Sequence, residues 1–110
     1  MEHLIIRPAT RGDVEQVLAF IVELAEYERL SDTVQATPQT VEGALFGAKP
    51  AAEALLAYWD GEAVGFAVYF TNFSTFLSRP GLYLEDLFVR PAVRRRGIGK
   101  AILTYLARIC

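Results

Sequence analysis

The sequence predicts one small domain of the α/β class that combines helices and strands in the order β-α-α-β-β-β-α. The chain has 110 residues, of which 53% are hydrophobic, so it suits a single domain with its own core. Three segments carry helix signals, and four shorter apolar runs are bounded by turn residues. No linker, repeat or low-complexity stretch divides residues 1–110.

A short strand and a long helix are expected first. Residues 4–6 are apolar and read as a strand. Thr10 and Asp13 have the spacing of a capping box, which marks the start of a helix. Apolar residues then recur at helical spacing, so this helix should run to about residues 27–30.

A second, short helix and a hairpin follow. Thr37-Pro38 predicts the helix start, because proline suits the first helical position, and Gly47 predicts its end. Residues 53–59 and 63–73 are expected to be strands, joined by Asp60-Gly61 in a two-residue turn. Gly65 predicts a bulge or a close backbone approach within the strand at residues 63–73.

The last part of the chain is expected to hold a loop, a strand and a helix. Residues 71–81 are expected to form a loop. Leu82 to Val89 is nearly all apolar, which predicts a strand buried on both faces. Ile98 to Ile109 has helical periodicity.

The turn before this last helix is strongly basic. Arg94, Arg95 and Arg96 lie at the positive end of the helix dipole, where each cation is unfavourable by about 0.3–1 kcal/mol. A bound polyanion would reverse that effect. The first helical amides lack partners within the helix, and Gly97 and Gly99 let the backbone approach a ligand. A solvated basic turn is the alternative, but the glycines and the strand-turn-helix context favour an anion site.

Carboxylates form two further candidate features. Glu23, Glu26 and Glu28 crowd the end of the first helix, which is either a solvated acidic face or a patch that receives a cationic substrate. Glu85 and Asp86 interrupt an apolar strand and should point to opposite faces. Both could be structural anchors, but the nearby anion loop favours a cleft role for one of them, and we expect Glu85 to have it.

Composition argues against several classes of protein. The net charge of −2 disfavours a general nucleic-acid binder. No apolar run approaches the ~20 residues of a membrane span, so no membrane partner is expected. His3 is the only histidine, and no metal site is expected. Cys110 is the only cysteine, which fits a cytoplasmic protein.

The stretch Arg94-Arg95-Arg96-Gly97-Ile98-Gly99 matches the Gln/Arg-x-x-Gly-x-Gly/Ala motif of the GCN5-related N-acetyltransferase (GNAT) superfamily. The order of elements also resembles the first two-thirds of that fold, which is built on a mixed sheet. More narrowly, the chain resembles the diamine (spermidine/spermine) N-acetyltransferase branch. The stretches that carry this likeness are Ile6–Thr10, Glu23–Ala25 with Tyr27-Glu28, Val64–Ala67, and Leu82–Asp86 with Phe88-Val89.

The resemblance implies an enzyme that transfers an acetyl group from acetyl-CoA to a primary amine of a small cationic molecule, such as a polyamine, a diamine or a lysine analogue. It implies that Tyr27 and Glu28 line the substrate pocket and that Glu85, near the reacting amine, is catalytic. Strand and turn backbone would hold the acetyl and pyrophosphate parts of the cofactor. The residues thus assigned to acetyl-CoA are Leu87, Phe88, Val89, Arg94, Arg95, Arg96, Gly97, Ile98, Gly99 and Lys100.

The resemblance also implies a homodimer. Family members usually continue into a fifth strand and further elements, so the domain at residues 1–110 is expected to be incomplete. Strand four would then have an open edge. The alternative function is therefore a non-catalytic half-domain that binds CoA or dimerises. A nucleic-acid contact through the arginines is weaker, given the net negative charge.

Overall fold

The computed structural model describes residues 3–109, and Met1, Glu2 and Cys110 lie outside that range. The expected cytoplasmic location rests on Cys110, which therefore lies outside the described residues. Among the described residues, no helix combines the length and the apolar character needed to cross a membrane.

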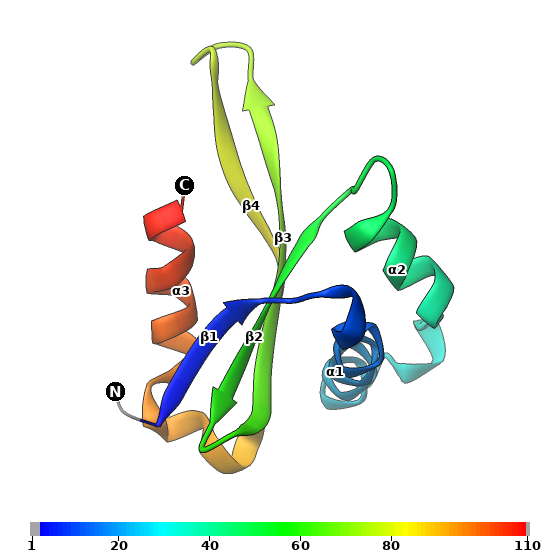
Figure 1. The fold of residues 1–110 in the computed structure, drawn as a ribbon, viewed down its shortest axis with the longest axis vertical. Helices are drawn as coiled ribbons and strands as arrows, with labels where there is room; N and C mark the ends of the chain where they lie inside the picture. Colours follow the sequence, from blue (N-terminus) through cyan, green and yellow to red (C-terminus); the bar gives the residue numbers. More distant parts are fainter. Residues whose placement is uncertain (1–2, 110) are drawn as a thin grey trace.

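The described elements follow the predicted order (Figure 1). Three short 3-10 helices, η1 (Arg11–Asp13), η2 (Ser31–Thr33) and η3 (Pro91–Arg96), lie before α1, after α1 and before α3. The strands and α-helices are β1 (Leu4–Pro8), α1 (Val14–Tyr27), α2 (Pro38–Phe46), β2 (Glu53–Trp59), β3 (Glu62–Ser74), β4 (Arg79–Val89) and α3 (Ile98–Ile109).

The strands form one sheet in the order β1-β2-β3-β4, and each neighbouring pair is antiparallel. The structure thus holds an antiparallel part of the mixed sheet that the resemblance implies. Asp60 and Gly61 have φ values of 50° and 82°, which fits the predicted two-residue turn between β2 and β3.

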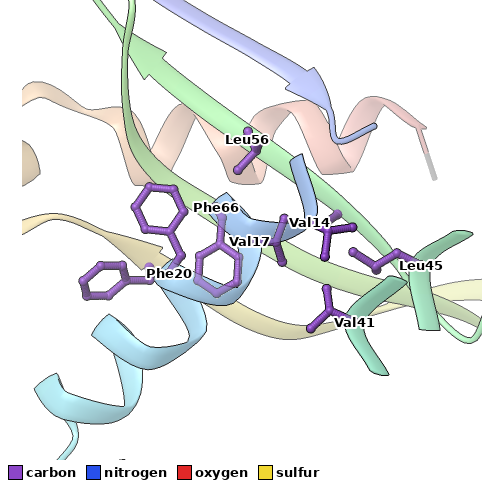
Figure 2. Close-up of a cluster of buried hydrophobic side chains, with 9 residues drawn as sticks. Val14, Val17, Phe20, Val41, Leu45, Leu56 and Phe66 are labelled. Carbon is purple, nitrogen blue, oxygen red and sulfur yellow. The ribbon is translucent and has the colours of Figure 1, made fainter. Parts of the chain in front are cut away.

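The helices cover the two faces of the sheet separately: α1 and α2 lie on one face and α3 on the other (Figure 1). In the first core, Phe20 of α1 stacks on Phe66 of β3 with ring centroids 5.5 Å apart (Figure 2). In the second core, Ile98 and Ile102 of α3 are fully buried against the opposite face. The sheet is therefore held between two apolar layers, which fix both ends of the β4–α3 turn.

The β3–β4 hairpin is longer than predicted. Only residues 75–78 separate the strands, so most of the expected loop at 71–81 is strand. The predicted burial of β4 on both faces is wrong, because only Phe88 and Val89 are buried on this strand. The rest of β4 runs along the sheet edge into a hairpin that projects beyond the helices, where Phe76 is 98% exposed (Figure 1).

Gly65 has both features that its position predicted. The β2–β3 register pairs Ala57 with Gly65 and Tyr58 with Ala63, so β3 has one extra residue there. A Cβ on Gly65 would lie 2.8 Å from the carbonyl oxygen of Phe88. The glycine thus allows β3 to approach the part of β4 that leads into the basic turn.

Candidate active site

The turn between β4 and α3 presents free helical amides. Gly97 has φ 75°, a left-handed conformation that suits glycine, and α3 begins at the next residue. The first bond of the helix runs from the Ala101 amide to the Gly97 carbonyl oxygen, at 3.0 Å. The amides of residues 98–100 precede that bond and are available to an anion.

Arg94 lines a cavity beside this turn. Its Nε donates to the Val89 carbonyl oxygen at 2.8 Å, and its guanidinium carbon lies 4.1 Å from the centroid of the Tyr27 ring. The cavity has a volume of about 360 Å³ and lies between α1, β4 and the start of α3. Its walls are formed by Leu24, Tyr27, Glu28, Leu87, Phe88, Val89, Arg94 and Gly99.

The structure places the remaining basic-turn residues outside this cavity. The guanidinium carbon of Arg96 lies 5.0 Å from the Trp59 ring centroid, and Arg95 is exposed. Gly97 and Lys100 line a separate hollow along α3. The side chain of Ile98 is fully buried in the α3 core, so only its backbone is available to a ligand.

The two strand carboxylates differ in their surroundings. The β3–β4 register pairs Val68 with Asp86 and Tyr69 with Leu84, which leaves Glu85 as the extra residue of a bulge. Glu85 is exposed and lines neither the cavity beside Arg94 nor the one beside Asp86. The prediction that Glu85 and Asp86 point to opposite faces assumed the side-chain alternation of a regular strand, so it could not foresee this bulge.

Asp86 lies in a second cavity, of about 240 Å³, between α1 and the loop that follows it. Burial, then the charges of Glu85 and Glu28, raise the pKa of Asp86 above its usual value. Leu24 and Glu28 line this cavity and also the one beside Arg94, so the two cavities adjoin. The site therefore has a cationic end and an anionic end.

The predicted acidic patch on α1 is divided. Both carboxylate oxygens of Glu23 accept hydrogen bonds from Arg90. Glu26 is exposed, and only Glu28 of the three lines the cavities. Among residues 3–109, no group of three or more histidine, cysteine or acidic side chains is arranged to hold a metal ion.

Comparisons with known proteins identify the family. Residues 18–110 match the model of the Acetyltransferase (GNAT) family. Over 117 residues, the chain is 37% identical to thialysine N-epsilon-acetyltransferase of Bos taurus, covering 99% of this chain and 68% of that protein. Over 116 residues, it is 32% identical to spermidine/spermine N(1)-acetyltransferase-like protein 1 of Homo sapiens, covering 99% of this chain and 16% of that protein.

Solved structures agree on the fold. An aminoglycoside acetyltransferase from an uncultured soil metagenomic sample, in complex with trehalose, matches with a TM-score of 0.83 at 18% identity. The match covers 98% of this chain and 70% of that one. Together with the motif at Arg94–Gly99 and the curated relatives, this shows that the chain belongs to the GNAT family of acetyltransferases and resembles its diamine branch.

Proposed function

We propose that this chain is an N-acetyltransferase that moves an acetyl group from acetyl-CoA to a primary amine of a small cationic molecule. The observation that carries the proposal is the pair of adjoining cavities, one beside the basic turn and one beside Asp86, with Glu28 in the wall of both. An anionic cosubstrate and a cationic acceptor would thus meet between α1 and β4.

The cationic end suits the phosphates of CoA. The amides of residues 98–100 would bind the pyrophosphate, and Arg94, which lines the cavity, would add positive charge beside it. β4 is the last strand of the described sheet, so its outer edge offers backbone groups near Leu87 to the pantetheine arm. Bound acetyl-CoA supplies the thioester that the amine attacks.

The anionic end suits an aliphatic ammonium group. Glu28 and Asp86 would attract it, and Leu24, Leu30 and Val34 offer apolar walls to its carbon chain. Relatives named for thialysine, L-ornithine (Arabidopsis thaliana) and spermidine/spermine support this choice, because such molecules carry aliphatic amines. We assign the acceptor to the diamines, polyamines and lysine analogues.

The reaction requires the amine to lose a proton before its nitrogen attacks the acetyl carbon. An alkyl ammonium has a pKa of about 10.4, so direct abstraction by an ordinary carboxylate is strongly uphill. Asp86 is better suited than an exposed carboxylate because its raised pKa narrows that gap. Glu85, the residue implied by the resemblance, stays a candidate that acts through a water molecule. The new C–N bond forms as the C–S bond breaks, and the departing thiolate takes a proton.

A second candidate function is a non-catalytic half-domain that binds CoA or dimerises. It is favoured by exposed aromatic side chains along the hairpin, Phe73 and Tyr83 among them, which lie beside an edge of β4 that no other strand within residues 3–109 covers. Pairing of this edge with a second copy would produce the homodimer that the resemblance implies.

A thiol-release assay with acetyl-CoA separates these functions. The acceptor panel contains spermidine, ornithine, thialysine and a monoamine with an uncharged chain. Turnover with the cationic amines supports the transferase, whereas CoA binding without turnover supports the half-domain. The absence of CoA binding overturns the transferase and leaves only dimerisation for the half-domain. Glu28→Gln should raise the KM of diamines by up to about fivefold and that of the monoamine less, since an ion pair at an exposed carboxylate is worth about 0.2–1 kcal/mol. Equal effects on both would remove Glu28 from the amine site.

A further inference from the structure

Arg90, the first residue after β4, connects three parts of the fold. Its backbone amide donates to the Val64 carbonyl oxygen at 2.8 Å, and its Nη1 donates to the Ala63 carbonyl oxygen at 3.1 Å. Its Nε and Nη2 donate to the two carboxylate oxygens of Glu23 on α1, each at 2.9 Å. The guanidinium carbon also lies 5.1 Å from the ring centroid of Phe20. Arg90 therefore ties the end of β4 to the start of β3 and to α1.

The geometry of the Arg90–Glu23 ion pair is more restricted than that of an ordinary surface ion pair. The planar guanidinium meets the carboxylate through two parallel bonds, which fixes distance and orientation together. The side chains are only 35% and 32% exposed, and Phe20 beneath them is fully buried. By contrast, Arg11 and Glu42 make a single contact of 3.4 Å with side chains 64% and 53% exposed.

The pair lies directly beside the proposed active site. Glu23 is four residues before Tyr27 on α1, so the two side chains lie on the same helix face one turn apart. Arg94 is four residues after Arg90, and its guanidinium covers the Tyr27 ring. Two arginines from the β4–α3 turn thus contact successive turns of α1. The contact between Arg94 and Tyr27 forms part of the cavity wall, whereas the contact between Arg90 and Glu23 does not.

We propose that Arg90 and Glu23 form a positioning clamp that holds the last turns of α1 at a fixed distance from the β4–α3 turn. The clamp sets the width of the cavity between Tyr27 and Arg94. Neither residue of the clamp lines that cavity, so both act through their neighbours. The inference rests on the proposed function, because cavity width matters to catalysis only if both substrates bind there.

The clamp makes an asymmetric prediction for the two substrates. Tyr27 is the last residue of α1 and Glu28 follows it, so this wall lies beyond the buried residues of α1, at an exposed helix end that the clamp restrains. The amides of residues 98–100 belong to α3, which its own buried core holds in place. Loosening the clamp should therefore impair the amine and largely spare acetyl-CoA.

The test uses Glu23→Gln and Arg90→Lys, singly and combined, with Glu42→Gln as the matched control from the exposed pair. Glu23→Gln removes the charge, and Arg90→Lys keeps the charge but loses the two parallel bonds. Each single variant should raise the amine KM about tenfold, because small displacements of positioning groups are costly, and leave the acetyl-CoA KM within about twofold. The amine KM of the double variant should be no higher than that of the single variant with the higher amine KM. Glu42→Gln should behave like the unaltered chain.

Melting curves first establish that every variant is folded at the assay temperature. Parallel changes in both KM values, additive effects in the double variant, or the same change in Glu42→Gln would overturn the clamp. If the unaltered chain acetylates no amine, the proposed function fails, and hydrogen exchange then tests the clamp independently. Faster exchange of the amides of residues 24–28 in the clamp variants, but not in Glu42→Gln, supports the clamp, and unchanged exchange overturns it.

Discussion

Gly97 and Gly61 offer a matched pair of substitutions that isolates the function of the β4–α3 turn. Both glycines have left-handed backbones, with φ values of 75° and 82°, and a Cβ at either position would meet no atom within 4 Å. Replacement by alanine at either site therefore introduces backbone strain without a steric clash. For an L-residue, that strain is about 1–2 kcal/mol.

The two sites should express this strain differently. Gly61 lies in the β2–β3 hairpin and lines neither site cavity, so Gly61→Ala should only lower stability. For a domain of this size the melting temperature should fall by roughly 4–8 °C per kcal/mol. In Gly97→Ala the turn can relax toward negative φ, which redirects the amides of residues 98–100. Strain of about 1–2 kcal/mol that is released in this way and restored on binding weakens CoA about five- to thirtyfold.

Calorimetry with CoA and thermal melting measure the two quantities on the same samples. We expect a CoA dissociation constant within about twofold of the unaltered chain for Gly61→Ala, and a rise of about five- to thirtyfold for Gly97→Ala. Equal CoA affinity in the two variants, with both folded, would refute the assignment of the α3 amides to the anion. A loss of affinity in Gly61→Ala alone would refute it as well.

Three further predictions concern stability and charge. Hydrogen bonds from Arg7, and then from Thr10, hold the pKa of Asp13 at about 2, below its usual 3.8. About 2 kcal/mol of stability is thus present above pH 4 and lost as the pH falls toward 2, and urea titrations across that range should show this loss in the unaltered chain but not in Asp13→Asn. Asp86→Asn should raise the melting temperature of the ligand-free chain at pH 7, since burial and neighbouring carboxylates disfavour its charge. The same variant should lower kcat/KM for the amine at least tenfold, because Asp86 is the proposed proton acceptor, and a lower melting temperature or an unchanged kcat/KM would contradict this. Phe20→Ala should lower the free energy of unfolding, measured by urea titration, by about 3–5 kcal/mol, because a fully buried ring is lost. Leu103→Ala, at a half-exposed position, should lower it far less.

Features that depend on local chemistry could be predicted from the sequence. The start of α2 at Pro38 and the tight turn at Asp60-Gly61 follow from the conformations those residues prefer. The glycine-containing turn before α3 follows from the same kind of preference at Gly97. Its role as an anion site is a prediction that the free amides support and that the CoA measurements will test.

Features that depend on distant pairing were decided by the tertiary structure. A bulge in the β3–β4 register leaves Glu85 unpaired and exposed, whereas Asp86 lies beside Glu28. Glu23 lies in an acidic run, but its partner Arg90 comes 67 residues later. The sequence by itself determined which segments form helices, strands and turns, except at the β3–β4 hairpin, where most of residues 71–81 are strand and not loop. The other assignments reflect the preferences of neighbouring residues. Only the tertiary structure decided which carboxylates line the site and which serve the fold, because register and helix docking depend on contacts across the whole chain.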